Sequence, residues 1–173
     1  LLDEVFFGEG DAPLADRRVA EAAARFLQYF DPNWLVVYLG WPDKIAHARG
    51  ADGEPYRLAA QHSDQLIEMI AAAMNFSRAV LIVTSDHGHV AQGGHGGAEA
   101  EVVETPFVAV GARIVPGDLG RIRQSDIAPT IAALLGGSLP SASQGTILFD
   151  MLEMSAAQKA QKALALAQQH REL

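Results

Sequence analysis

The sequence contains no cysteine among its 173 residues, so disulfide bonds and thiolate chemistry are excluded. Its apolar runs, such as 34–39 and 79–83, are far shorter than the ~20 residues that a membrane-spanning helix needs. Basic residues are also few. The 13 Lys and Arg stand against 21 Asp and Glu, and the net charge of −8 argues against nucleic acid or an anionic membrane surface as a partner. Hydrophobic residues nevertheless make up 49% of the chain, which is enough for a buried core and excludes a disordered tail.

Apolar residues at helical spacing predict two amphipathic helices, over residues 16–30 and 56–75. We expect Asp126 to cap a third helix that ends at Gly136. The stretch 155–173 is rich in Ala, Gln, Leu and Lys and is predicted to be a helical tail or a linker.

Three short apolar runs predict strands between those helices, at 34–39, 79–83 and 107–110. The first two are apolar at every position, which is typical of parallel strands that are buried on both faces. Helices and strands that alternate in this way favour an α/β fold with a mostly parallel sheet flanked by helices. Because no interior linker is visible, residues 1–154 are expected to form one domain or part of one.

Asp86 and His87 follow the predicted strand at 79–83 almost directly. Ligands of open α/β sheets bind in the crevice beyond the carboxyl ends of the strands. Because Gly88 allows the chain to bend there, both side chains can converge on one ion. A carboxylate beside an imidazole is a common ligand pair for zinc or manganese, so this segment is a candidate metal site.

His95 and the pair Asp43 and His47 are further candidate ligands. Two glycines flank His95 on each side, and they indicate a loop whose backbone comes close to a neighbour and presents the imidazole. The alternative is a merely flexible loop. Asp43 and His47 follow the predicted strand at 34–39 and are four residues apart, so one helical turn places them on the same side. The alternative for this pair is a solvated helix face.

The other histidines carry weaker signals. His89 is next to the Asp86 and His87 segment, and a role in supporting a ligand or at the edge of the substrate is favoured over metal binding. His62 lies within a predicted helix and is expected to be solvated or partly packed, and His170 lies in the tail.

Taken together, these segments resemble the alkaline phosphatase superfamily, in particular its phosphodiesterase/nucleotide pyrophosphatase and sulfatase-like branches. That superfamily has an Asp-x-x-x-His segment, an Asp-His-Gly segment after a strand, and a histidine in a glycine-rich loop. The same order occurs here at 43–47, 86–88 and 94–96. Residues 104–111 resemble the strand that follows, and 124–145 resemble the closing helix and turn, so the resemblance spans about 34–150. Ala46 departs from the pattern, which usually has glycine there.

The resemblance implies an alkaline phosphatase-like fold and two divalent metal ions in the complete enzyme, zinc in the first place and manganese as the alternative. Asp43, His47 and His95 would hold one ion, while Asp86 and His87 would hold the other.

The family completes its second metal site with an upstream aspartate and a nucleophilic Ser or Thr. No Ser or Thr precedes Ser63 in this sequence. We therefore expect the chain to be the C-terminal part of an incomplete catalytic domain that binds one metal ion or none by itself. Missing strands would leave a sheet edge exposed, through which the chain is expected to self-associate.

The resemblance implies that the complete enzyme is a metal-dependent hydrolase of small-molecule phosphate mono- or diesters or sulfate esters, and that this chain alone is inactive. The alternatives are a phosphomutase of the same superfamily and a non-catalytic metal-binding or interaction module. A nucleophilic Ser or Thr upstream of the chain would favour an enzyme. An exported or membrane-anchored parent protein is compatible with the acidic, cysteine-free composition, which does not determine the location.

Overall fold

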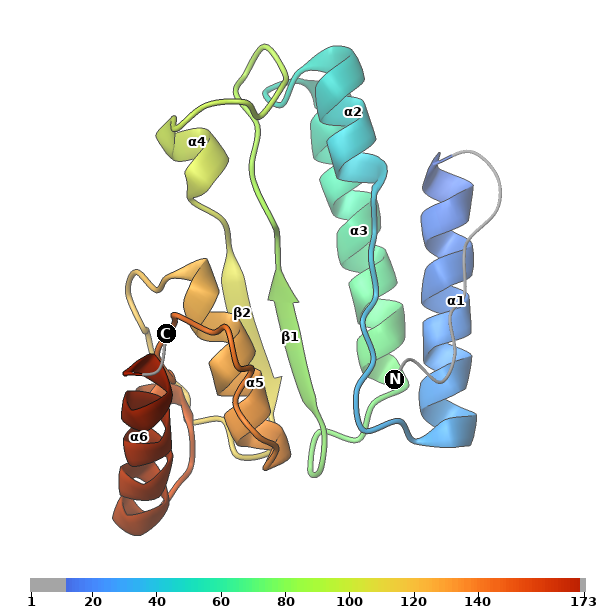
Figure 1. Cartoon of the computed structure of the whole chain (residues 1–173). Coiled ribbons are helices and arrows are strands. Elements are labelled where there is room, and N and C mark those ends of the chain that lie inside the picture. The colour runs from blue at the N-terminus through green and yellow to red at the C-terminus, as the bar shows by residue number, and fades with distance from the viewer. Residues whose placement is uncertain (1–11, 172–173) are drawn as a thin grey trace. The chain divides into compact units, whose positions relative to one another are not determined.

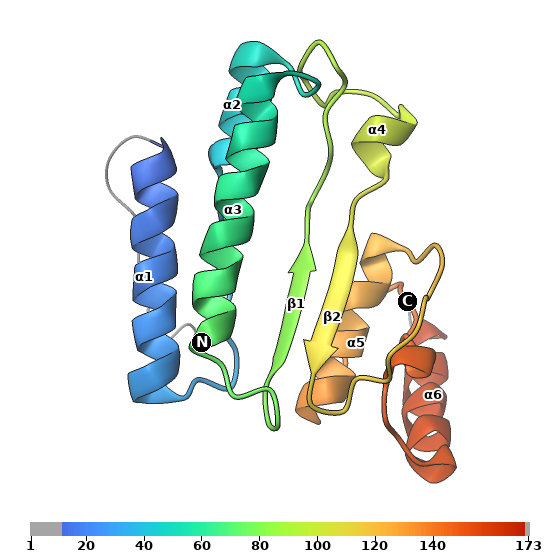
Figure 2. The same ribbon diagram turned by 180° about the vertical axis from the view of Figure 1, so that it is seen from behind.

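The computed structural model of the chain describes residues 12–171. They divide into two compact units, residues 12–75 with 83–108 and residues 76–82 with 109–171. Within the described residues, no helix combines the length and the apolar character needed to cross a bilayer. Figures 1 and 2 show the elements, which are α1 (Ala12–Phe30), α2 (Trp41–Arg49), α3 (Glu54–Ala72), β1 (Val80–Thr84), α4 (Ala100–Val103), β2 (Phe107–Gly111), the 3₁₀ turn η1 (Gln124–Asp126), α5 (Ile127–Leu135), the 3₁₀ turn η2 (Phe149–Met151) and α6 (Ala156–His170).

The first unit is built on the packing of α1 against α3, which lie side by side in both views (Figures 1 and 2). Ala20 and Ala23 of α1 are buried against Leu66 and Ile70 of α3. These positions recur at helical spacing, so each helix turns one apolar stripe toward the other. The two helices correspond to those predicted at 16–30 and 56–75, and α2 also packs on α3.

The segment 34–39 runs extended from α1 to α2 without forming a strand, so the prediction of a strand buried on both faces is wrong. Its odd-numbered side chains pack on the core of the first unit, whereas its even-numbered side chains are at least 51% exposed. Alternate residues of an extended chain point to opposite sides. Both sides of this segment are apolar in sequence, but the unit covers only one of them.

The sheet in the described part of the chain consists of β1 and β2, which run antiparallel (Figure 1). The mostly parallel sheet expected from the sequence is not confirmed. The segment 34–39 was predicted to be a strand of this sheet, but it forms no backbone ladder with β1 or β2. The strands themselves lie within one residue of the ranges predicted at 79–83 and 107–110. The observed fold is therefore a mixture of helices with a small sheet.

The second unit is organised around the carboxylate of Asp126, which is only 4% exposed. Its Oδ1 accepts the Thr146 N–H at 2.7 Å, and its Oδ2 accepts the Arg123 N–H at 3.1 Å. The side chain therefore joins η1 to the segment around Thr146. Asp126 occupies the N-cap position of α5, as predicted, but its side chain makes no capping hydrogen bond there. The predicted end of α5 is confirmed, because Gly136 adopts a left-handed conformation with φ of 73°.

At the C-terminus, Ser155 accepts a hydrogen bond from the Gln158 N–H and begins α6 with a capping box. The division of the chain at residue 154 into a domain and a tail stays a prediction.

The hydrogen bonds of Asp126 predict a pH dependence for the stability of this protein. Burial raises the pKa of Asp126, but the donors of Thr146 and Arg123 outweigh it and hold the pKa below its ordinary value. A carboxylate with a lowered folded-state pKa stabilises the fold above about pH 4, and this contribution is lost as the pH falls through the folded-state pKa. Asp126→Asn should therefore lower the free energy of unfolding at pH 7 and have much less effect near pH 3. Urea unfolding at both pH values measures this.

The matched control is Asp150→Asn, because the Asp150 side chain is exposed. It should leave the unfolding free energy unchanged at both pH values. An equal loss of stability for Asp126→Asn at pH 7 and pH 3 would show that the charge of Asp126 contributes nothing.

Candidate metal centre

The start of α2 is held by a buried carboxylate from α1. Asp16 is 6% exposed, and its two oxygens accept the Gly40 N–H at 3.0 Å and the Trp41 N–H at 2.9 Å. The first N–H groups of a helix lack partners within the helix, and a negative charge there is favourable. Asp16 thus ties the helix that carries Asp43 and His47 to α1.

Asp43 and His47 lie one turn apart on α2, as the sequence predicted. The distance between Asp43 Oδ1 and His47 Nε2 is 3.5 Å. Between them, Ala46 is 0% exposed, so the methyl group that replaces the usual glycine is accommodated inside the unit.

The loop after β1 passes close to α4 at Gly88. Its N–H donates to the Val102 carbonyl at 2.8 Å, and any Cβ at this position would collide with the Glu101 carbonyl. The chain can therefore pass against α4 only with glycine here. His87 Nδ1 lies 3.2 Å from the Gly88 carbonyl, and a proton on Nδ1 donated to that oxygen leaves the lone pair of Nε2 available for a metal ion.

Gly93 brings the loop that carries His95 against α2. Gly93 has φ of +93°, and a Cβ there would lie 2.5 Å from the Ala46 carbonyl oxygen. This close approach delivers His95 to α2, where its Nε2 lies 3.0 Å from His47 Nε2. The close backbone approach expected of the four glycines is present at Gly93, whereas nothing lies within 4 Å of the point that a Cβ would occupy at Gly94 or Gly96.

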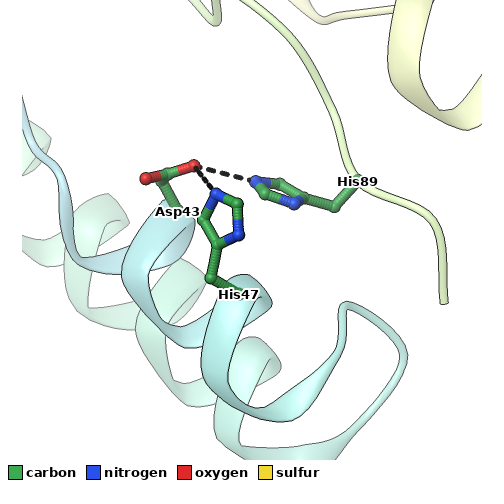
Figure 3. A group of neighbouring side chains, drawn as sticks. All are labelled: Asp43, His47 and His89. Atoms are coloured by element: carbon green, nitrogen blue, oxygen red, sulfur yellow. Dashed lines mark hydrogen bonds and ion pairs between the residues drawn. The ribbon is translucent and has the colours of Figure 1, made fainter. Parts of the chain in front are cut away.

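Four imidazoles and one carboxylate form a cluster where α2 meets this loop. The closest pairs of imidazole rings have centroids 4.0 to 5.2 Å apart. Two groups of three have donor atoms within 4.8 Å of one another, and both contain Asp43: one with His47 and His89 (Figure 3), the other with His87 and His95. All six donors, including Asp86, come from the first unit.

The structure brings together four of the five predicted ligands, Asp43, His47, His87 and His95. The fifth, Asp86, lies at the edge of this cluster. Asp86 belongs to neither group of three, its side chain is 74% exposed, and its Oδ2 lies 3.7 Å from His87 Nε2. The predicted assignment of Asp43, His47 and His95 to one ion and of Asp86 and His87 to another stays a prediction.

The sequence favoured a supporting role for His89, which stays a prediction, and gave no prediction for Asp16. His89 is the buried histidine of the cluster, at 8% exposure, and its Nε2 lies 3.0 Å from Asp43 Oδ1. Asp16 shares one face of α1 with the buried Ala20 and Ala23. An acidic residue on the inward face of an amphipathic helix is a signal that could have identified it, because a buried carboxylate needs hydrogen-bond donors from another part of the chain.

The donor set fits a divalent transition metal. Zinc bonds to imidazole nitrogen and carboxylate oxygen at ~2.0–2.2 Å, so two ligands of one ion lie at most ~4.4 Å apart, close to the spacing within these groups. The facing Nε2 atoms of His47 and His95 also suit neutral imidazoles that share an ion. In addition, the buried Nδ1 of His89 has no hydrogen-bond partner.

The pKa of the Tyr38 phenol responds to its burial and to the carboxylates around the cluster. Partial desolvation of its phenol, followed by the carboxylates of Asp43, Asp86 and Asp16, raises the pKa of Tyr38. The negative potential of these carboxylates favours the binding of a cation.

Comparison with known proteins decides the family. The family model for type I phosphodiesterase / nucleotide pyrophosphatase matches residues 7–99, which include all three ligand-bearing segments. The chain belongs to this family. The family is part of the alkaline phosphatase superfamily. The match ends before residues 104–145, for which the sequence also suggested a resemblance. No solved structure matches the chain.

This member of the type I phosphodiesterase family is similar to curated ethanolamine phosphate transferases and phosphoglycerate mutases. It is 25% identical to human GPI ethanolamine phosphate transferase 2, catalytic subunit, over 158 residues, and 29% identical to GPI ethanolamine phosphate transferase 1 of Schizosaccharomyces pombe over 189 residues. These alignments cover 85% and 95% of this chain. It is also 30% identical to the 2,3-bisphosphoglycerate-independent phosphoglycerate mutase of Shewanella denitrificans over 127 residues, 68% of this chain. The chain spans 16% to 24% of the length of these three relatives.

Gly93→Ala tests whether the close approach of the loop to α2 positions the cluster. The methyl group would meet the Ala46 carbonyl, and φ of +93° is strained for alanine, so we expect a loss of ~1–3 kcal/mol in local stability and weaker zinc binding. Gly96→Ala is the matched control, because nothing lies within 4 Å of the point that its Cβ would occupy and its φ is not positive. Isothermal titration calorimetry with zinc and chemical unfolding measure both quantities. Equal zinc affinity in the two variants would contradict this role of Gly93.

Proposed function

We propose that this chain carries the metal-binding part of an enzyme that transfers a phosphoryl group from a small-molecule phosphoester. The observation that supports this most directly is the convergence of Asp43 with His47, His87 and His95 in a chain of the type I phosphodiesterase family. Catalytic metal sites in proteins commonly use three ligands of these types.

We propose Asp43, His47 and His95 as ligands of one divalent ion, and Asp86 and His87 as protein ligands of a second. When bound, such ions polarise phosphoryl oxygens and lower the pKa of an oxygen nucleophile. Asp43 supplies negative charge from α2, and the imidazoles of the loop supply neutral nitrogen donors. The exposure of Asp86 and of His47 suits a site that must admit both a phosphoester and further ligands.

The chemistry of the substrate is narrowed by the relatives. The names of the transferases and of the mutase concern phosphate compounds, which favours a phosphate ester over a sulfate ester. The sequence suggested hydrolysis, in which water receives the phosphoryl group. The names of the transferase relatives favour instead an acceptor other than water.

Intramolecular phosphoryl transfer is the second candidate. It is favoured by the similarity to the phosphoglycerate mutases of Shewanella denitrificans and Moorella thermoacetica, which are 30% and 27% identical to this chain. The same ligand residues serve this reaction, because only the acceptor of the phosphoryl group changes.

Zinc titration of the chain and of His95→Ala tests the proposed metal site. The wild-type chain should bind one zinc ion, and His95→Ala should lower the affinity by at least about 100-fold, because a missing ligand costs at least as much as a missing outer-shell partner. The matched control is His170→Ala, since His170 lies exposed on α6 and contacts the Ser143 carbonyl. Calorimetry gives the affinity, and mass spectrometry gives the stoichiometry.

Two outcomes would overturn the proposal. One is a wild-type chain that binds no zinc or manganese at the cluster. The other is a loss of affinity in His170→Ala as large as in His95→Ala, which would place the metal elsewhere.

A further inference from the structure

His89 differs from the other histidines of the cluster in its burial. Its side chain is 4% exposed, compared with 50% for His47 and 29% for His87. It belongs to none of the three segments that carry the family resemblance, because it lies beyond Gly88 in the loop after β1. A buried imidazole needs a polar partner, and His89 has one on a single side.

That partner is the carboxylate of Asp43. His89 Nε2 lies 3.0 Å from Asp43 Oδ1, and because a carboxylate oxygen accepts, His89 Nε2–H must be the donor (Figure 3). The same nitrogen cannot donate to Asp43 and bind a metal ion at the same time. The opposite nitrogen, Nδ1, is buried without a hydrogen-bond partner.

The backbone fixes the ring in this place. The Gly88 N–H donates to Val102, and glycine alone fits against the Glu101 carbonyl, so the direction of the chain into His89 is set by α4. Asp43 in turn is set by α2. The hydrogen bond thus connects two independently positioned backbones through one carboxylate oxygen.

We propose that His89 is a positioning residue that orients the carboxylate of Asp43 for the metal ion. Its Nε2–H donates to Oδ1, the oxygen that also faces His47 Nε2 at 3.5 Å, and so fixes the rotation of the carboxyl group on the side of the proposed ligands. This inference rests on the proposed function, because it assigns Asp43 to a metal ion. Removal of a hydrogen-bond partner of a metal ligand typically lowers metal affinity by ~10–100-fold.

Three variants of the 173-residue chain test this proposal by zinc affinity. His89→Met keeps an apolar side chain of similar size but has no donor, and it should bind zinc ~10–100-fold more weakly with unchanged stoichiometry. His89→Gln retains an N–H donor and should recover most of the lost affinity. His170→Met is the matched control for a methionine in place of an exposed histidine, and it should bind zinc as the wild type does.

A second measurement needs no metal. Imidazole ¹⁵N NMR of the metal-free chain should show His89 with its proton on Nε2, and Asp43→Asn should change that signal. Wild-type affinity in His89→Met would overturn the positioning role alone. Lower zinc stoichiometry in both His89 variants would overturn it in favour of direct ligation. A wild-type chain that binds no zinc would overturn the proposed function, and the positioning role with it.

Discussion

The carboxylate of Asp43 is the group on which the geometry of the cluster depends. Both sets of three donor atoms include it, and its Oδ1 lies within 3.5 Å of both His47 and His89. It is the one carboxylate in either set of three, and the other members are imidazoles. Under the proposed function it shares a metal ion with them.

The position of Asp43 depends in turn on a second carboxylate. Asp16 reaches from α1 to the first N–H groups of α2, and α1 is anchored on α3 by a small apolar core. The loop with His95 reaches α2 from the other side through the close contact of Gly93 with Ala46. Site geometry therefore follows from helix packing and two backbone contacts, all within the first unit. The loop that carries His87, His89 and His95 begins at the end of β1.

The local elements could largely be predicted from the sequence, whereas the sheet could not. Helical spacing located α1 and α3, and apolar runs located β1 and β2, because each pattern reflects contacts within a few residues. The segment 34–39 was misjudged because its sequence is apolar on both sides, and composition does not say which side a neighbour covers. Asp126 occupies the predicted N-cap position of α5, but its side chain makes no capping hydrogen bond for a related reason: it accepts from Thr146, twenty residues later.

The candidate ligands were accessible to sequence reasoning because they occur in short segments with a chemical pattern. Asp43 with His47, Asp86 with His87, and the glycine-flanked His95 needed no knowledge of distant contacts. His89 and Asp16 act through contacts across 46 and at least 24 residues of sequence, and no spacing rule reveals these. The type I phosphodiesterase family model spans all three of these segments.

Zinc-edge anomalous diffraction from crystals of this chain grown with zinc tests the proposed metal centre most directly. We expect an anomalous peak at bonding distance, ~2.0–2.2 Å, from an Asp43 oxygen and from the Nε2 atoms of His47 and His95. His89 Nε2 should remain hydrogen-bonded to the carboxylate of Asp43. Well-ordered side chains in the cluster with zinc bound only elsewhere on the surface would contradict the proposed metal centre.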